Sequence, residues 1–215
     1  MMTVAESRRS PPWRWPLALL QRYPVTAGVY AIVLSLGAWT AGRPDRHATL
    51  LRVFGISWAD LAGMRLYRLA TAVMIQSRPG LRATIGLLLV VIPFAEWRLG
   101  PRLTAITLFI GDWVSTVSVL ITLRLLAAMG SSAALTAAMT RDGGTSSGVH
   151  ALAAATIVGI EQPTVRRCVA FVLTVEIATM LVFTHHLYDA QHALAALTGW
   201  GLARIFRSRN RRQAR

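Results

Sequence analysis

The sequence is short of charged residues, cysteine and lysine. Only 15% of its 215 residues are charged, lysine is absent, and Cys168 is the single cysteine. Soluble domains usually carry about 25% charged residues, so this shortage excludes an ordinary soluble enzyme and a disordered chain. One cysteine excludes an internal disulfide and a cysteine-rich metal site.

Long apolar runs take the place of the missing charge. Hydrophobic residues make up 54% of the chain, its mean hydropathy is +0.48, and residues 23–42, 83–95 and 143–160 carry no charge. A membrane-spanning helix needs about 17–25 predominantly apolar residues. The runs and their charged boundaries predict six helices, at 25–41, 81–97, 103–126, 146–160, 168–185 and 190–206.

These helices predict an all-α membrane protein, a bundle of six transmembrane helices over residues 25–206. A basic N-terminal segment, 1–24, precedes the bundle, and an arginine-rich tail, 207–215, follows it. A long connection over 42–80 joins the first two helices and contains amphipathic pieces too short to span a membrane.

The basic residues are all arginine and cluster at the ends of the apolar runs. They give a net charge of +14 and a pI near 11.7. This placement is typical of membrane proteins and argues against nucleic-acid binding. With the N-terminus in the cytoplasm, fourteen arginines lie inside and nine outside. We therefore expect both termini inside, a multi-pass plasma-membrane location, and contact between the tail and anionic lipid headgroups.

A serine and a histidine that are distant in sequence fall at the same predicted membrane depth. Ser146, in Gly144-Thr145-Ser146-Ser147-Gly148, lies at the outer end of the fourth helix, and His192 at the outer end of the sixth. Serine becomes a nucleophile only when a base removes its proton. The N–H groups at a helix N-terminus offer a place for an oxyanion.

At these positions the chain resembles the rhomboid family of intramembrane serine proteases. The family's Gly-x-Ser motif opens its fourth helix, and small residues follow its sixth-helix histidine, as Ala195 and Gly199 follow His192. The segment 96–100, Glu-Trp-Arg-Leu-Gly, is similar to the end of the family's second helix, and Tyr67-Arg68 resembles an aromatic–arginine pair in its first loop. The resemblance covers about 60–205.

The resemblance implies a six-helix rhomboid-like fold, N-in and C-in, and a Ser146–His192 dyad that cleaves transmembrane protein substrates. In the family, a histidine and an asparagine on the second helix help to hold the oxyanion. Those positions fall near Gly80 and Thr84, so Thr84 and the turn at Gly144 are the expected oxyanion groups here.

Two further residues are expected to line the site. The aromatic residue that follows the family serine by four positions is His150 in this chain, and i+4 spacing places it on the same helix face as Ser146. Asp142, just before the turn, is expected to cap the fourth helix or to orient a site group.

Other interpretations of these residues remain open. Ser146 and Ser147 with their glycines also suit a helix-packing seam, and His192 also suits a buried polar bond to a neighbouring helix. His185 and His186 suit a solvated position at the outer headgroups. The missing second-helix pair favours a non-catalytic relative that binds transmembrane helices.

Two acidic residues stand inside predicted spans, Asp112 in the third and Glu176 in the fifth. Intramembrane acids usually mark function, so they suggest a small ion-coupled transporter as a third hypothesis. A transporter typically shows an internal repeat, and we find none in the sequence. No metal-ligand spacing links the histidines, so we expect neither a metal nor a cofactor.

Overall fold

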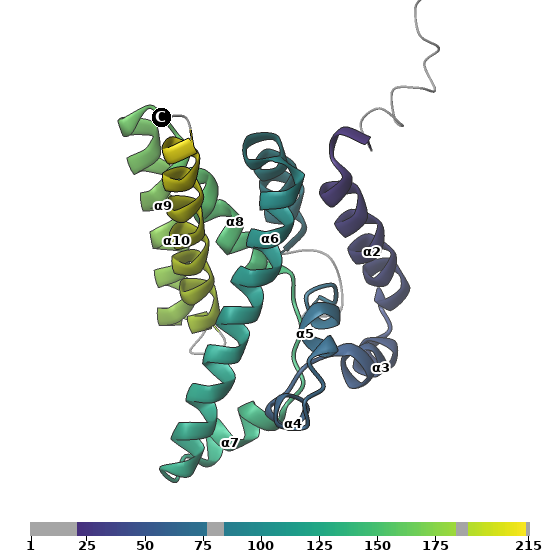
Figure 1. Ribbon diagram of the computed structural model, residues 1–215. Helices are drawn as coiled ribbons and strands as arrows, with labels where there is room; N and C mark the ends of the chain where they lie inside the picture. Colours follow the sequence, from purple (N-terminus) through teal and green to yellow (C-terminus); the bar gives the residue numbers. More distant parts are fainter. Residues whose placement is uncertain (1–20, 77–83, 184–188, 214–215) are drawn as a thin grey trace, which may run out of the picture.

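The computed structural model describes residues 21–76, 84–183 and 189–213. Within them the fold is all helical, without a strand, and one isolated β-bridge joins Ile56 to Asp142 (Figure 1). The helices are α2 (Pro24–Thr40), α3 (Pro44–Phe54), α4 (Trp58–Ala62), α5 (Tyr67–Ala72), α6 (Thr84–Ala128), α7 (Ser132–Met139), α8 (Ser146–Val158), α9 (Pro163–Phe183) and α10 (Asp189–Gln213).

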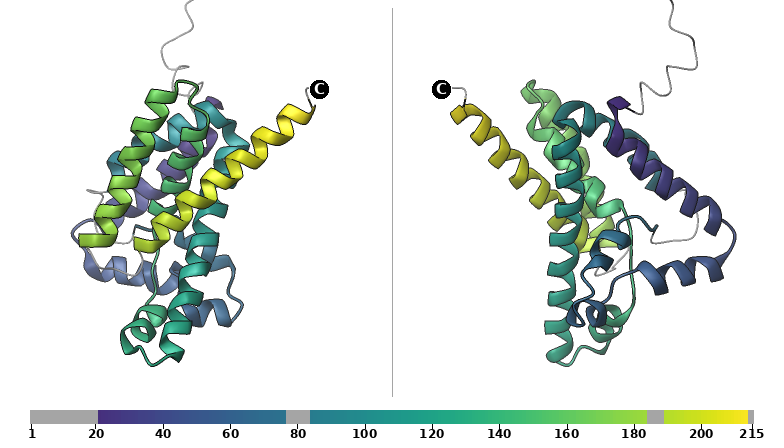
Figure 2. Two further views of the ribbon diagram at one scale, coloured as in Figure 1. Left: turned by 90° about the vertical axis from the view of Figure 1, so that its left-hand side faces the viewer. Right: turned by 45° about the vertical axis from the view of Figure 1, so that its right-hand side comes forward.

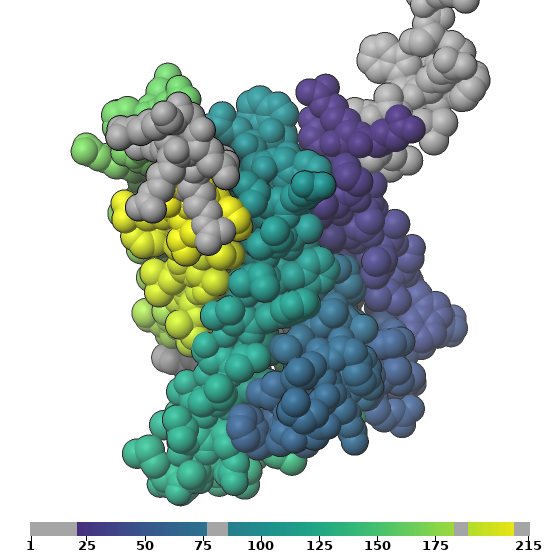
Figure 3. All heavy atoms as spheres, in the orientation of Figure 1, coloured from purple at the N-terminus to yellow at the C-terminus, as the bar shows by residue number. Residues whose placement is uncertain are grey.

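Helix α8 is the centre of the bundle. Ten of its residues are buried, and it packs chiefly on α6 and α10. Helix α9 lies on the outer side of α8 and α10, whereas α2 stands on the far side of α6 (Figures 1 and 2). The space-filling view shows α6 between α10 on one side and α2 to α5 on the other (Figure 3). Residues at the N-terminus of α8 are therefore enclosed by several elements.

Helix α6 is two helices that meet at Gly100. This residue has φ 77° and ψ 164°, outside the helical region, a conformation that glycine adopts without strain. Leu88 and Ile92 from the first half share a core cluster with Leu108 from the second half, so the two halves pack against each other. The two helices predicted at 81–97 and 103–126 thus correspond to the helical segments 84–99 and 101–128.

The residues before Gly100 tie three helices together. The buried carboxylate of Glu96 accepts hydrogen bonds from the N–H groups of Val25 and Thr26, at 2.9 and 2.7 Å, and so caps the N-terminus of α2. Arg98 donates to the carbonyl of Gly159 at 2.6 Å, and Arg207 donates to that of Val158. Cations at a helix C-terminus are favourable, so two arginines hold the end of α8 remote from Ser146.

The connection between α2 and α6 folds around one buried carboxylate, Asp60. Its side chain is completely buried and accepts from Ser57 at 2.8 Å, Arg65 at 3.1 Å and Arg141 at 3.0 Å. Arg68 approaches it to 3.4 Å and donates to the carbonyl of Gly55. We call these five side chains the Asp60 cluster. It fastens α4 and α5 to the segment that leads into α8.

Two helix boundaries and one connection differ from the sequence prediction. The fifth helix begins at Pro163 rather than 168, because proline is favoured in the first turn and the two arginines that suggested a boundary lie within the helix. The sixth helix extends past 206 to Gln213, so most of the predicted tail is helical. The small-residue connection before the fourth helix contains α7, whose N-terminus is capped by the Ser131 hydroxyl.

In the described residues, one helical stretch is long and apolar enough to cross a membrane: Gly86–Ala128 of α6, counted across the break at Gly100, with a mean hydropathy of 1.8 in its best window. Helices α2 and α8 are apolar but shorter.

Candidate active site

A tight turn before α8 places Ser146 at the first position of the helix. The N–H of Gly144 donates to the carbonyl of Ala72 at 3.0 Å, and the hydroxyl of Thr145 donates to that of Val73 at 2.7 Å. A Cβ atom on Gly143 would lie 2.9 Å from the Ala72 oxygen, closer than packed atoms allow. The glycine therefore lets the turn press against the end of α5.

Helices α8 and α10 approach until their backbones touch. A Cβ atom on Gly199 would lie 2.0 Å from the carbonyl oxygen of Ala151, and one on Gly111 in α6 would lie 2.2 Å from the Ala151 Cβ. Such small residues permit close helix packing. His192 lies seven residues before Gly199, two turns along the same helix face, so this contact fixes the height of His192 beside Ser146.

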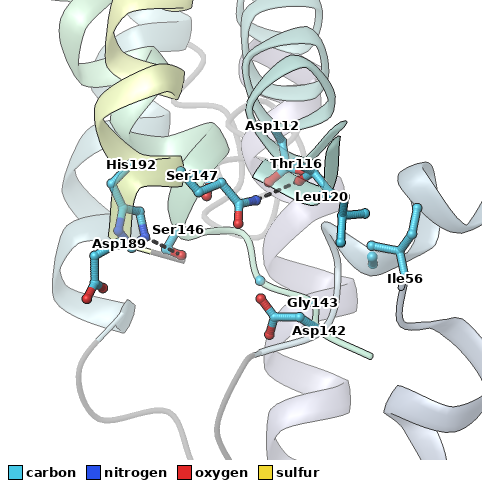
Figure 4. Close-up of a pocket in the computed structure, with 13 residues that line it drawn as sticks. Ile56, Asp112, Thr116, Leu120, Asp142, Gly143, Ser146, Ser147, Asp189 and His192 are labelled. Atoms are coloured by element: carbon cyan, nitrogen blue, oxygen red, sulfur yellow. Dashed lines mark hydrogen bonds between the residues drawn. The ribbon is translucent and has the colours of Figure 1, made fainter. Parts of the chain in front are cut away.

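The structure brings Ser146 and His192 together. His192 Nε2 lies 3.0 Å from Ser146 Oγ, although the two residues are 46 positions apart. Figure 4 shows the two side chains facing each other from α8 and α10. In the tautomer in which Nε2 accepts the serine proton, the ring proton sits on Nδ1, which is buried and has no hydrogen-bond partner among the described residues. Within the part of the chain that the structure describes, the arrangement is a dyad without an acid on Nδ1.

His150 packs against the histidine of this dyad. The two imidazole centroids are 4.4 Å apart with an interplanar angle of 39°. His150 Nδ1 lies 2.7 Å from the carbonyl oxygen of Ser146, which only accepts, so Nδ1 carries a proton. His150 Nε2 faces Glu176 Oε1 of α9 at 3.6 Å. The aromatic position expected from the sequence therefore holds a histidine that is braced from both sides.

The first turn of α8 offers N–H donors near the serine. The first intrahelical bond of α8 runs from the N–H of Val149 to the carbonyl of Thr145, which leaves the preceding N–H groups without an acceptor inside the helix. Thr84 begins α6, but its side chain lies outside the described residues, as does Gly80. Their expected part in the oxyanion site stays a prediction.

A cavity of about 270 Å³ opens beside the dyad. Ser146, His192, Asp112, Asp142 and Asp189 are among the residues that line it (Figure 4). It lies among α6, α8, α10 and the turn before α8. The cavity is smaller than the roughly 300–1,000 Å³ of most small-molecule sites, so its size suits one side chain.

Two lining residues form a polar link across the cavity wall. Gln191 Nε2 donates to Thr116 Oγ1 at 2.6 Å, and Thr116 stands four residues after Asp112, on the same face of α6. Neither Gln191 nor Thr116 was predicted from the sequence to belong to the site. The signal was present in Gln191, a polar residue directly before His192, and in Asp112, an acid inside an apolar run.

The predicted site residues lie together with few exceptions. Ser146, His192 and His150 make direct contacts, and Asp142 and Gly144 line the cavity. Asp142 does not cap α8, because the N-cap residue is Thr145. The packing seam proposed as an alternative also exists: a Cβ on Gly148, beside the serines, would lie 2.7 Å from the Leu108 oxygen of α6, and Gly111 and Gly199 add further close contacts. His185 and His186 lie outside the described residues.

Comparison of the chain with protein-family models, with curated proteins and with solved structures gives no match.

Proposed function

We propose that this chain is a rhomboid-like intramembrane serine protease, with Ser146 as nucleophile and His192 as general base. The observation that carries the proposal is the 3.0 Å separation of Ser146 Oγ and His192 Nε2. A nucleophile and a base within about 2.6–3.2 Å are the mark of an activated serine. The family motifs in the sequence supply the reaction class.

In the proposed reaction, His192 Nε2 removes the Ser146 proton as Oγ attacks a peptide carbonyl of a transmembrane substrate. The N–H groups of the first turn of α8 stabilise the oxyanion, since they have no acceptor within the helix. His192 then donates the proton to the leaving amine, and water hydrolyses the acyl-enzyme by the same route. His150 holds the ring plane of His192 during both transfers.

The proposed architecture is a six-span bundle in which α2, both halves of α6, α8, α9 and α10 cross the membrane. Large apolar side chains on the outside support it, since Phe171 and Val172 of α9 are 69% and 65% exposed and Leu197 of α10 is 65% exposed. Exposed apolar patches of this kind need a partner or lipid. Arg98 and Arg207, at the end of α8 remote from Ser146, favour a cytoplasmic position for that end.

The test is cleavage of single-span model substrates by the purified protein in liposomes. We expect a product whose new N-terminus lies within the outer part of the substrate helix. Ser146→Ala and His192→Ala reduce cleavage to background, because loss of a serine nucleophile or its base typically costs about 10⁶-fold. Ser118→Ala is the matched control, since this α6 serine does not line the cavity. Cleavage that persists in Ser146→Ala contradicts the proposal.

A non-catalytic relative that binds transmembrane helices is the second candidate. It is favoured by Gly80, which stands near a position where the family has a side-chain donor. It predicts that model substrates co-purify with the protein, uncut, and equally well with Ser146→Ala. A carrier that uses Asp112 and Glu176 instead predicts pH-dependent flux that Asp112→Asn abolishes.

A further inference from the structure

The cavity beside Ser146 is acidic in a strongly basic protein. Three of its lining residues are aspartates, Asp112, Asp142 and Asp189, whereas none of the 13 lining residues that the structure describes is an arginine. The chain as a whole carries a net charge of +14. The nearest arginine along the chain, Arg141, is held by Asp60 at 3.0 Å. The cavity therefore differs in charge from the rest of the chain, whose cationic side chains are arginines.

One carboxyl oxygen of this cavity is buried without a partner. Asp112 is 3% exposed, and its Oδ1 has no hydrogen-bond partner among the described residues. Buried polar atoms are nearly always satisfied, and an exception needs an explanation. The hydroxyl of Thr116, one turn along α6 from Asp112, already accepts a hydrogen bond from Gln191. Asp112 lines the cavity, and its Oδ1 stays without a donor among the described residues.

A second carboxyl reaches the cavity from another wall. Asp142 stands in the turn before α8, where its backbone pairs with that of Ile56. Burial raises the pKa of Asp142, although a hydrogen bond from the N–H of Gly143 and the charge of His47 act in the opposite direction. The local groups of the protein thus only partly compensate this carboxyl.

We propose that the cavity accepts a cationic side chain, arginine or lysine, of the substrate residue whose carbonyl Ser146 attacks. This inference rests on the proposed protease function and names the class of substrate. The serine and the histidine occupy one wall, Asp112 another (Figure 4), and the volume of about 270 Å³ holds one long side chain. A guanidinium or ammonium group supplies the donors that Asp112 Oδ1 lacks, and it has no acceptors of its own that would remain unpaired.

Substrate preference tests this assignment in the protein that cleaves. Matched single-span substrates differ at one position, with arginine, lysine, methionine, glutamine or glutamate before the cut bond. We expect arginine and lysine to be cleaved at least about 10-fold faster than methionine or glutamine, and glutamate slowest, because a site built for hydrogen bonding rejects a group that leaves it unpaired. Asp112→Asn is expected to reduce the ratio of arginine to methionine cleavage to within about 3-fold. Asp45→Asn, an exposed α3 residue outside the cavity, removes the same charge and keeps the preference.

Binding without turnover separates this inference from the proposed function. Ser146→Ala protein is titrated with 4-aminobenzamidine, a cation, and with 4-aminobenzamide, its neutral counterpart. We expect the cation to bind at least about 10-fold more tightly, and Asp112→Asn to remove the difference. Equal binding of both probes, or equal cleavage of the arginine and methionine substrates, overturns the cationic assignment even where the wild type labels with a fluorophosphonate. If the protein neither cleaves the substrates nor reacts with the fluorophosphonate, but binds the cationic probe selectively, the protease proposal is wrong and the cation-binding site is still supported.

Discussion

Two buried aspartates show how differently this chain treats the same residue in two regions. Asp60, in the connection between α2 and α6, is completely buried and surrounded by Ser57, Arg65, Arg68 and Arg141. Asp112, in α6, is 3% exposed and has one oxygen without a partner among the described residues. The first carboxylate holds a loop region together, and the second faces a cavity beside Ser146. The two carboxyls are similarly buried, so burial does not distinguish them. They differ in their hydrogen-bond partners, which surround Asp60 and leave one oxygen of Asp112 unpaired among the described residues.

Replacing each of the two aspartates by asparagine is expected to give the largest difference in the free energy of unfolding. Asp60→Asn leaves the buried Arg68 guanidinium without its carboxylate, and breaking one side of a buried ion pair costs about 3–5 kcal/mol. Asp112→Asn keeps the shape and breaks no ion pair among the described residues, so the free energy of unfolding should change by less than about 1 kcal/mol. Denaturant titration in detergent micelles measures both. A larger loss for Asp112→Asn than for Asp60→Asn reverses the comparison.

The second-largest effect on stability is expected where α8 and α10 pack beside the cavity. Gly199→Ala forces a Cβ into the backbone of Ala151, and overpacking of this kind typically costs about 1–3 kcal/mol. It also moves His192 away from Ser146, so proteolytic activity should fall further than stability. Gly201→Ala is the matched control in the same helix, because nothing lies within 4 Å of its added Cβ. An active, fully stable Gly199→Ala protein would show that the close contact of α8 and α10 does not set the site.

The Asp60 cluster also predicts a dependence of stability on pH. Burial by itself raises the pKa of Asp60, but the hydrogen bonds from Arg141 and Ser57 and the charge of Arg68 hold the pKa below its ordinary value of 3.8. The stabilisation is therefore complete above that ordinary value and is lost as the pH falls through the lower pKa of the folded protein. The free energy of unfolding of the wild type should decrease more steeply below about pH 4 than that of Asp60→Asn. Parallel acid profiles for the two proteins contradict this assignment.

The smallest effect is expected at the rim of the same cluster. The Arg65 side chain is 54% exposed, although it lies 3.1 Å from Asp60. Exposed ion pairs contribute about 0–1 kcal/mol, so Arg65→Ala should lower the free energy of unfolding by no more than that. Arg68→Ala, at a side chain that is 8% exposed, should cost more in the same titration. Equal losses for the two arginines would remove the distinction between rim and interior.

Much of this arrangement could be anticipated from the sequence, and the reasons are physical. Apolar runs between arginines located the long helices, and glycine spacing after His192 reflects backbone contact with Ala151, as seen at Gly199. Helix ends were less accurate where charges lie inside a helix, as at the start of α9. Local sequence patterns do not reveal which side chains distant in sequence come into contact, because the packing of the helices determines those contacts.

The partners of single polar residues illustrate this limit. In the sequence, Glu176 stands among apolar residues of a predicted span, and its position 3.6 Å from His150 follows only from the packing of α9 on α8. Likewise, no local pattern indicates that Asp60 forms ion pairs with arginines of α5 and of the segment before α8. The Ser146–His192 pair could be predicted, because the sequence motif and the predicted membrane depth of the two residues gave two independent constraints.

The most direct test of the central claim is fluorophosphonate labelling of the protein in lipid, with the modified residue identified by mass spectrometry. The account predicts one adduct on Ser146 Oγ, absent in Ser146→Ala, strongly slowed in His192→Ala, and retained in Ser118→Ala. Labelling of another serine, or no labelling of a folded wild-type protein, would contradict the assignment of Ser146 as an activated nucleophile.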